Sequence, residues 1–454
     1  MSVAVKFVII GGGPAGNTAA TYAARLGADV TLIERDVLGG AAHLWDCIPS
    51  KTMIATGGAM SFADRISGMG LSHLDAHLEV DAQRKRIQDI ENRLKDHVTE
   101  LLVSQEVRLI HGTARLKGPH AVVVETQTGL EELEADAILV STGTRPRIPA
   151  WVEPDGDRIL TTRQAYPPKT MPEHLVVVGS GVTGVEFVHM FASFGSKVTL
   201  IVSRQQVLPN KDPEVAAALE DELLRRGVRL FKGARAEMIE RTEAGVAVAC
   251  DDGRVALGTH ALLAIGSIPN SDGMGLEEAG VVTDGGYIEI NQHCQSSVPH
   301  IYAAGDVSGK LPLSSVASMQ GRKIAEHVMG IHTREHRHID YEKAASAIFT
   351  EPEIADVGLA EADAFATGRK IRVTKVPYAA TAKALINDDP GGFVKIISDP
   401  ATGVVLGGSI VGRHAAELIS VIALAVTANL KVSDIVESCL VHPTLSEALA
   451  DAAE

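Results

Sequence analysis

One short pattern occurs twice in this chain of 454 residues, and the two copies lie 168 residues apart. The first copy begins with a continuous apolar segment at residues 6–10 and continues through the glycine-rich turn GGGPAG at 11–16. An alanine-rich stretch at 17–26 and a second apolar segment at 29–33 follow. Because continuous β-branched segments are typical of strands buried on both faces of a sheet, this order predicts a strand–turn–helix–strand unit.

The second copy has the same order of segments. An apolar segment at 174–178 precedes the turn GSGVTG at 179–184, a helical stretch at 185–194 and another apolar segment at 197–202. Two such units in one chain predict two parallel α/β modules of the dinucleotide-binding type.

The glycine spacing of the first turn indicates phosphate binding. Gly11 permits a tight turn, Gly13 lets backbone N–H groups approach a pyrophosphate, and Gly16 lets the helix pack closely on the strand. The N-terminus of the helix stabilises the phosphate charge. Glu34, at the end of the second strand, supplies a carboxylate that accepts a hydrogen bond from a ribose 2′-hydroxyl. Strand, helix and acid together favour this interpretation over a purely structural glycine turn.

The second turn, with Gly179, Gly181 and Gly184, follows the same logic but its second strand ends differently. Ser203 and Arg204 stand where an acidic residue would favour NAD. With no carboxylate to repel it, a 2′-phosphate could be held by these two side chains, so NADPH use alongside NADH is predicted. The alternative is that Arg204 is a solvated loop charge.

The C-terminal third predicts a domain of another type, because it contains no phosphate-binding glycine turn. Segments at 392–397 and 404–411 are typical of strands, and helical stretches follow at 415–429 and 432–437. This pattern indicates an α+β domain.

Two intervening segments carry no nucleotide motif. Residues 81–105 have apolar residues at helical spacing, and the polar, proline-containing segment 146–172 is typical of a connector. His332, His336 and His338 lie in a polar stretch, where solvated loop histidines are favoured over ligands, so no metal is predicted.

Charge and cysteine content exclude several classes of protein. The net charge of −15 repels phosphate backbones and argues against a nucleic-acid partner. Four cysteines form neither a disulfide framework nor a zinc-site spacing, which favours a reducing compartment. The first apolar run stops at Gly11 and is too short for a signal peptide or a membrane span. A cytoplasmic protein with no stable membrane insertion is expected.

Further segments carry a resemblance to a known family. Together with the two glycine turns they resemble the flavoprotein disulfide reductases, the class I pyridine nucleotide-disulfide oxidoreductases that include lipoamide dehydrogenase, glutathione reductase and mercuric reductase. The resemblance covers essentially the whole chain. The segments are GGAAHLWDCIPSK at 39–51, STGTRP at 141–146, AIGSIPN at 264–270, IYAAGD at 301–306 and VHPTLSE at 441–447.

The resemblance implies an α/β fold with two Rossmann-like dinucleotide-binding domains and a C-terminal α+β dimerisation domain. The implied boundaries are 1–148 for an FAD-binding domain, 149–270 for an NAD(P)H-binding domain, 271–334 for a central part that completes the FAD domain, and 335–454 for the dimerisation domain. It further implies a homodimer in which His442 of one subunit faces the flavin of the other.

The resemblance also implies which residues contact the cofactors. Asp306 would bind the flavin ribityl chain, and Lys51 and Glu186 would form an ion pair beside the flavin ring, where the nicotinamide docks. The residues expected to bind FAD are Gly11, Gly13, Pro14, Ala15, Gly16, Glu34, Gly40, Ala41, Lys51, Thr142, Gly143, Gly305 and Asp306. Those expected to bind NAD(P)H are Gly179, Gly181, Val182, Thr183, Gly184, Glu186, Ser203, Arg204 and Gly266.

One departure from the family pattern bears on function. The family carries two cysteines five positions apart, and here Cys47 is retained while the partner position is Ala42. A disulfide needs two sulfurs about 2.05 Å apart, so thiol–disulfide exchange is not available in the family's usual way. Electrons that reach the flavin from NAD(P)H must therefore leave directly to an acceptor.

The acceptor is predicted from two runs of sequence. Ala41-Ala42 before Cys47, and LPLSSVASMQGR at 311–322, resemble the branch of NAD(P)H:quinone reductases formerly labelled lipoamide dehydrogenases. The predicted function is transfer of two electrons from NAD(P)H through FAD to a quinone or similar small acceptor. The alternatives are a soluble pyridine nucleotide transhydrogenase, a dihydrolipoamide-dehydrogenase-like flavoprotein and a catalytically silent flavin or NAD sensor.

Two candidate catalytic groups remain. His442 and Glu447 retain the family's acid–base pair, and the hypothesis is that His442 donates a proton to the reduced quinone; the alternative is a relic held by packing. Cys47 precedes Pro49 at a predicted helix start, where the helix dipole favours a thiolate that donates charge to oxidised flavin; the alternative is an inert core residue. Of the other cysteines, Cys439 is expected to be structural, and Cys250 and Cys294 are expected to be plain core or surface residues.

Overall fold

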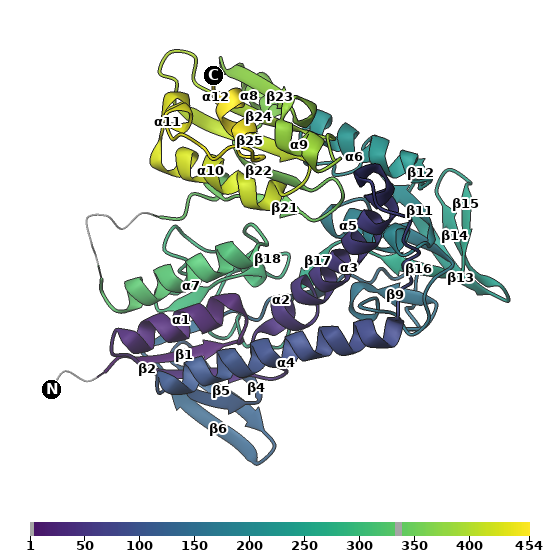
Figure 1. The fold of residues 1–454 in the computed structure, drawn as a ribbon. Helices are drawn as coiled ribbons and strands as arrows, with labels where there is room; N and C mark the ends of the chain where they lie inside the picture. Colours follow the sequence, from purple (N-terminus) through teal and green to yellow (C-terminus); the bar gives the residue numbers. More distant parts are fainter. Residues whose placement is uncertain (1–3, 332–337) are drawn as a thin grey trace. The chain divides into compact units, whose positions relative to one another are not determined.

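The computed structural model describes residues 4–331 and 338–454, and the chain forms two compact units (Figure 1). The first unit comprises Met1–Ser50, Arg84–Arg147 and Ser267–Tyr341. The second comprises Lys51–Gln83, Ile148–Gly266 and Glu342–Glu454. Each contains a five-stranded parallel sheet, which confirms the predicted fold class. Of the histidines considered as ligands, His332 and His336 lie outside the described residues.

The parallel sheet of the first unit has the strand order β20-β7-β1-β2-β3. β1 (Lys6–Ile10) lies at its centre, between β7 (Ala137–Val140) and β2 (Asp29–Glu34). The edge strands are β3 (Arg108–His111) and β20 (Ile301–Ala303). Because β20 pairs with β7, the chain returns to this sheet after forming the second glycine module.

Alternate residues of β1 enter two different cores, as expected for a strand covered on both faces. Phe7 and Ile9 pack with residues of helices α1 (Pro14–Arg25) and α7 (Ser314–Val328). Val8 and Ile10 pack against a small antiparallel sheet on the other face. The strands of that sheet are β4 (Thr113–Leu116), β5 (Ala121–Thr126) and β6 (Gly129–Glu134).

Helix α1 begins three residues before the predicted helical stretch, because Pro14 occupies its first turn, where a proline needs no N–H partner. Helix α7 lies alongside it (Figure 1). The two backbones approach so closely that a Cβ on Gly321 would lie 2.2 Å from the carbonyl oxygen of Ala15. Glycine at position 321 is therefore what allows this contact.

The parallel sheet of the second unit has the order β12-β11-β10-β16-β9. Strands β10 (His174–Val178) and β11 (Lys197–Val202) have the predicted bounds, and β12 (Arg229–Lys232) and β16 (His260–Leu263) flank them. β9 (Ile159–Thr161) comes from the segment predicted to be only a connector. That prediction was incomplete, because three apolar residues between polar and proline-containing stretches give little periodic signal.

Helices α5 (Val182–Ser193) and α6 (Pro213–Arg225) belong to the second module. A separate antiparallel sheet follows, formed by β13 (Ala236–Thr242), β14 (Gly245–Cys250) and β15 (Val255–Gly258). This sheet packs onto the module through the apolar side chains of Ile239, Val246 and Val248.

The C-terminal part is a five-stranded antiparallel sheet with helices, as the α+β pattern predicts. The strands β24 and β25 correspond to the predicted pair, whereas β21, β22 and β23 were not predicted. In sheet order the strands are β21 (Ser346–Ile348), β22 (Ile354–Gly358), β25 (Val405–Val411), β24 (Phe393–Ser398) and β23 (Arg372–Pro377). The helices are α8 (Glu361–Thr367), α9 (Ala382–Ile386), α10 (Ala415–Ala428), α11 (Val432–Val436) and α12 (Glu447–Ala453).

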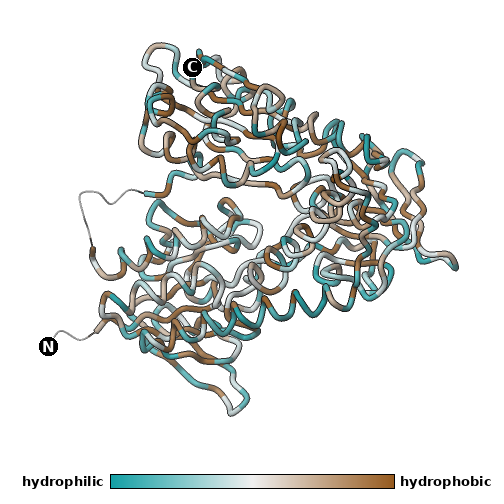
Figure 2. The backbone as a smooth tube through the Cα atoms, in the orientation of Figure 1, coloured by the Kyte–Doolittle hydropathy of each residue, from teal (hydrophilic) through white to brown (hydrophobic). Residues whose placement is uncertain are grey.

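Two further helices are long: α3 (Cys47–Arg65) and α4 (Val80–Ser104). The tube along α4 alternates between teal and brown, as expected for a helix with one apolar face (Figure 2). Short elements complete the fold: α2 (Gly40–Leu44) and the pairs β8 (Thr144–Pro146) with β17 (Ser267–Pro269) and β18 (Thr283–Asp284) with β19 (Tyr287–Ile288). Within residues 4–331 and 338–454, no helix has the length and apolarity that a membrane crossing requires.

The contact between α1 and α7 predicts the effect of Gly321→Ala. The added methyl would lie 2.2 Å from the Ala15 carbonyl oxygen, and such overpacking costs about 1–3 kcal/mol. Gly58→Ala is the matched control, because a Cβ at this helical glycine meets nothing within 4 Å. Thermal and denaturant unfolding should show a lower midpoint for G321A and an unchanged or higher midpoint for G58A. Equal midpoints for the two variants would contradict the close approach.

Candidate active site

The first glycine turn forms a cradle at the end of β1. Gly11 has φ +106°, and a Cβ there would lie 2.4 Å from the carbonyl oxygen of Ser141. A Cβ on Gly16 would lie 2.0 Å from the carbonyl oxygen of Gly11. At Gly13, by contrast, a Cβ would meet nothing within 4 Å, and no side chain caps the start of α1. The N–H groups at this helix start are therefore accessible to a pyrophosphate, as FAD would require.

Glu34 lies beside this cradle and is held by backbone groups. Its Oε2 accepts a hydrogen bond from the backbone N–H of Gly12 at 2.7 Å, and its Oε1 accepts one from Asp36 at 2.8 Å. The segment with Gly40 packs on the cradle, since a Cβ on Gly40 would lie 2.9 Å from the Gly13 Cα. Ala41 follows in the short helix α2. Carboxylate, turn and α2 are thus fixed relative to one another.

Asp306 lies at the start of a single helical turn after β20. Its Oδ2 accepts a hydrogen bond from the Thr144 hydroxyl at 3.0 Å, and burial raises the pKa of this carboxyl. Thr142 and Asn270 bond reciprocally: the Thr142 hydroxyl donates to the Asn270 carbonyl oxygen at 2.7 Å, and the Asn270 amide to the Thr142 carbonyl oxygen at 2.9 Å. These bonds tie the turns at 141–146 and 264–270 together. Thr144 was not predicted as a site residue, although it lies within the STGTRP motif.

Cys47 is the first residue of α3 and is exposed, and it forms no disulfide. Its carbonyl oxygen accepts a hydrogen bond from the Ser50 hydroxyl at 3.1 Å. The structure thus places Cys47 at a helix start, as the sequence predicts. Ala42, the position of the absent second sulfur, lies in α2.

The second glycine turn repeats the geometry of the first. Gly179 has φ +110°, and a Cβ on Gly184 would lie 1.9 Å from the Gly179 carbonyl oxygen. Gly181 precedes α5, with no side-chain cap and nothing within 4 Å of an added Cβ. The start of α5 therefore provides a second phosphate cradle. Its expected neighbours Val182, Thr183, Ser203 and Arg204 are exposed, and Gly266 has φ +93° with open space beside it.

Lys51 and Glu186 form an ion pair of 2.7 Å between Lys51 Nζ and Glu186 Oε2, from helices α3 and α5. The Glu186 side chain is only 7% exposed, whereas that of Lys51 is 31% exposed. Glu186 Oε1 accepts a hydrogen bond from the backbone N–H of Phe349 at 3.0 Å. The Phe349 ring centroid lies 5.0 Å from Lys51 Nζ. Phe349 was not predicted, because nothing in the local sequence signals a contact 163 residues away.

His442 and Glu447 are also paired. His442 Nδ1 lies 2.6 Å from Glu447 Oε1, and Glu447 Oε2 accepts a hydrogen bond from the Thr444 backbone N–H at 2.9 Å. The Thr444 bond, and then the His442 bond, lower the pKa of the Glu447 carboxyl. The carboxylate therefore engages the Nδ1 atom of the imidazole and not Nε2. The imidazole is largely solvent-exposed in the isolated chain.

The other cysteines occupy ordinary positions. Cys250 and Cys294 are buried, and burial raises the pKa of both thiols, to about 11 for Cys294. Cys439 is exposed. Across the part of the chain that the structure describes, no three His, Cys, Asp or Glu side chains are grouped so that they could hold a metal ion.

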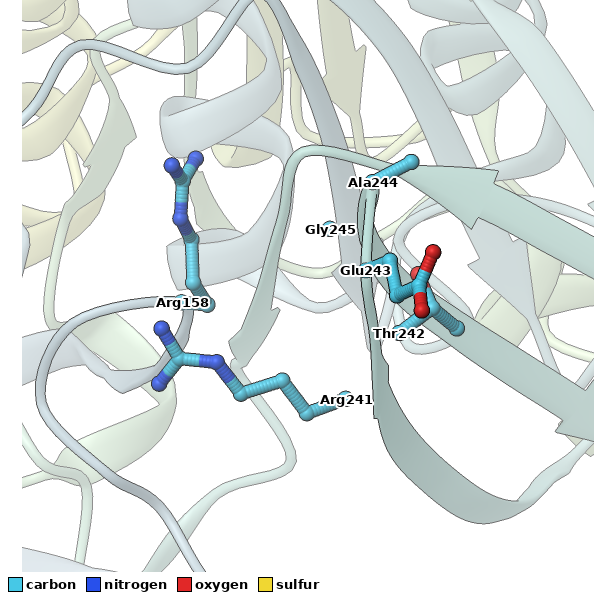
Figure 3. Close-up of a pocket in the computed structure, with 6 residues that line it drawn as sticks. All are labelled: Arg158, Arg241, Thr242, Glu243, Ala244 and Gly245. Atoms are coloured by element: carbon cyan, nitrogen blue, oxygen red, sulfur yellow. The ribbon is translucent and has the colours of Figure 1, made fainter.

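A polar pocket of about 120 Å³ lies at the β13–β14 hairpin and contains none of the predicted nucleotide-binding residues (Figure 3). Arg158 and Arg241 line it together with residues 242–245 of the hairpin (Figure 3). The Arg241 guanidinium is already paired with Asp155 and Asp157, at 2.8 Å from each carboxylate. The pocket is therefore formed by a surface charge cluster and is separate from the candidate active site.

The structure thus assembles the predicted residues in two groups. The first unit holds the expected FAD ligands of the glycine turn, Glu34, Gly40, Ala41, Thr142, Gly143, Gly305 and Asp306. The second unit holds the expected NAD(P)H ligands, the Lys51–Glu186 pair and the His442–Glu447 pair.

Comparison with known proteins agrees with this arrangement. Residues 5–321 match the family described as pyridine nucleotide-disulphide oxidoreductase, and residues 344–453 match its dimerisation domain. The chain belongs to this family of oxidoreductases, whose members are class I flavoprotein disulfide oxidoreductases. Membership implies FAD and NAD(P)H as cofactors, and the dimerisation domain supports a homodimer.

Individual relatives are similar over nearly the whole chain. The NAD(P)H dehydrogenase (quinone) of Mycobacterium tuberculosis is 41% identical, over 99% of this chain and 93% of the relative. The dihydrolipoyl dehydrogenase of Zymomonas mobilis is 34% identical, over 97% of this chain and 96% of the relative. The crystal structure of LpdA from Mycobacterium tuberculosis superposes with a TM-score of 0.93 at 40% identity and covers 99% of each chain. The predicted similarity to the quinone reductase branch is confirmed.

Proposed function

We propose that this protein is a cytoplasmic, homodimeric flavoenzyme that transfers two electrons from NAD(P)H through FAD to a quinone or similar small acceptor. The observation that carries the proposal is the identity of residue 42, which is Ala and not the second cysteine of the family's redox pair, while Cys47 is retained. Without a sulfur at position 42, the Cys47 thiol and residue 42 cannot cycle between dithiol and disulfide. The resemblance to a mycobacterial NAD(P)H dehydrogenase (quinone) supports the same acceptor class.

The first unit holds FAD in this proposal, and FAD supplies the two-electron chemistry when bound. The N–H groups at the start of α1 would bind the pyrophosphate, and Glu34 would accept a hydrogen bond from a ribose hydroxyl. Asp306, which is oriented by the Thr144 hydroxyl, would accept hydrogen bonds from the ribityl hydroxyls. Gly13 leaves the space that close approach of the phosphates requires.

The Lys51–Glu186 pair serves the nicotinamide step. A lysine held by a buried carboxylate is a fixed positive charge, which stabilises negative charge that develops beside it without reorganisation. The Phe349 backbone N–H keeps the second Glu186 oxygen engaged, so the carboxylate cannot rotate away from Lys51. Here the protein contributes position and charge to the reaction.

His442 serves the acceptor step. Glu447 accepts a hydrogen bond from Nδ1–H, so Nε2–H is the group that donates a proton to the oxygen of the reduced quinone. In the proposed homodimer this group is presented to the flavin of the opposite subunit. The hydrogen bond to Glu447 fixes the orientation of the His442 ring.

The acceptor is tested with purified holoenzyme and either NADPH or NADH. Wild type should reduce menadione rapidly and turn over lipoamide at less than about one hundredth of that rate, because the exchange thiol at position 42 is absent. Ala42→Cys should lose two titratable thiols on oxidation and gain lipoamide turnover, and Ala42→Ser is the matched control without a redox-active sulfur. Wild-type turnover of lipoamide that matches menadione would contradict the proposal. Reduction of thio-NAD as the only acceptor would identify a transhydrogenase. Reduction of the flavin by NADPH or NADH, with no electron transfer to any acceptor, would identify a sensor.

Replacement of His442 by Asn tests the proton-donor role. General-acid groups contribute about 10²–10⁴-fold in rate, so H442N should lower kcat with menadione by about 100-fold and leave the rate of flavin bleaching by NADPH unchanged. His77→Asn is the control, since His77 is exposed and contacts only a surface aspartate in the described ion pairs. A loss of less than threefold in kcat would show that the imidazole is a packing relic.

Replacement of Arg204 by Ala tests the nucleotide preference. A guanidinium bonded to a 2′-phosphate contributes about 1.5–3 kcal/mol, so R204A should raise the KM for NADPH at least tenfold and leave the KM for NADH within twofold. Arg225→Ala is the matched control, because Arg225 is exposed and paired with Glu222 on α6. An equal change in both KM values would show that Arg204 does not contact the 2′-phosphate.

A further inference from the structure

A buried amide connects the Gly305–Asp306 turn with the end of the first unit. Gln320, on α7, is only 1% exposed. Its Oε1 accepts a hydrogen bond from the backbone N–H of Gly305 at 2.7 Å. Its Nε2 donates to the Tyr341 hydroxyl at 2.9 Å. The Tyr341 hydroxyl is also hydrogen-bonded to the Cys294 thiol, which is buried.

The direction of this chain of hydrogen bonds is fixed by its first member. A backbone N–H is only a donor, so Gln320 must present its oxygen to Gly305 and its NH₂ group to Tyr341. Tyr341 then accepts from Gln320 and donates to the sulfur of Cys294. Burial raises the pKa of Tyr341 to about 12 and that of Cys294 to about 11, so both groups keep their protons at neutral pH. The chain is therefore intact under physiological conditions.

The Gly305–Asp306 turn depends on this support. Gly305 has φ +71°, a conformation that only glycine adopts readily. Its carbonyl oxygen accepts from the Ser308 backbone N–H at 3.0 Å and from the Ser308 hydroxyl at 2.7 Å, so its N–H and its C=O are both engaged. The next residue is Asp306, whose carboxylate is held by Thr144. Gln320 thus binds the backbone N–H of the glycine that directly precedes Asp306.

Gln320 is itself held in place by its neighbour in sequence. Gly321 lies against the Ala15 carbonyl oxygen at the first turn of α1. One dipeptide of α7 therefore contacts both the phosphate cradle, through Gly321, and the Asp306 turn, through Gln320. A displacement of α7 would disturb both parts of the FAD site together.

We infer that Gln320 is a positioning residue for FAD, and that Tyr341 orients it: the two side chains hold Gly305, and through it Asp306, in the geometry that receives the flavin. The inference rests on FAD being bound by the first unit, as in the proposed function. Tyr341 acts only through Gln320, since its hydroxyl contacts Gln320 and Cys294 and does not contact Gly305. Cys294 accordingly has a structural task as the terminal acceptor of the chain.

The test measures release and rebinding of FAD by the full-length protein, with flavin fluorescence as the readout. Gln320→Met removes both hydrogen bonds of the side chain while its volume stays similar. This variant should bind FAD about tenfold more weakly, because loss of a neutral hydrogen bond leaves the Gly305 N–H buried without an acceptor. Tyr341→Phe should weaken it about threefold. Tyr302→Phe is the matched control, because its hydroxyl bonds to His327 rather than to Gln320.

The double variant separates a positioning role from general destabilisation. Because Tyr341 acts through Gln320, Q320M/Y341F should bind FAD no more weakly than Q320M alone. Melting temperatures of the FAD-free proteins should change by similar amounts in Y341F and Y302F, so that only FAD release distinguishes the two.

Several results would overturn the inference. Additive losses in the double variant, or equal FAD release by Y341F and Y302F, would show that the chain is only core packing. If Q320M does not fold, the rates of FAD release by Y341F and Y302F still test the inference. Failure of the wild-type protein to bind FAD would instead refute the proposed function, and normal wild-type binding with unaffected variants would refute this inference alone.

Discussion

Close backbone contact at two glycine turns is the constraint on which both nucleotide modules depend. A Cβ on Gly16 would lie 2.0 Å from the Gly11 carbonyl oxygen, and one on Gly184 would lie 1.9 Å from that of Gly179. Any side chain would force the helix away from its strand, so only glycine sets the helix N-terminus directly at the end of the central strand. The phosphate cradles, and every group placed around them, follow from these two contacts.

The glutamates of the site are held in orientation by the same kind of hydrogen bond. Three of its carboxylates are each oriented by a backbone N–H: Glu34 by Gly12, Glu186 by Phe349 and Glu447 by Thr444. Because a backbone donor cannot change rotamer, one oxygen is fixed and the other is directed at its partner. Lys51 and His442 therefore receive partners whose orientation is set by the fold and does not depend on flexible side chains.

The fold by itself does not define the chemistry. The chain has the matched oxidoreductase and dimerisation domains of its family, and it contains the Lys51–Glu186 and His442–Glu447 pairs. The family's exchange chemistry also needs two sulfurs, and Ala42 removes one of them while leaving α2 and the start of α3 in place. In the proposed function, one side chain thus redirects electron flow while the fold of the family is kept, because function resides in the site.

Local sequence determined the modules: continuous apolar segments and glycine spacing predicted β1, β2, β10 and β11, since strand burial and tight turns leave short-range signals. The sequence also showed directly that residue 42 is Ala and not the second cysteine of the family pattern. Tertiary structure alone decided which distant groups meet. The Phe349 N–H reaches Glu186 across 163 residues, and the Gln320 amide reaches Gly305 from a separate helix. Such contacts leave no local pattern, because packing of remote segments brings the atoms together and neighbouring residues do not encode it.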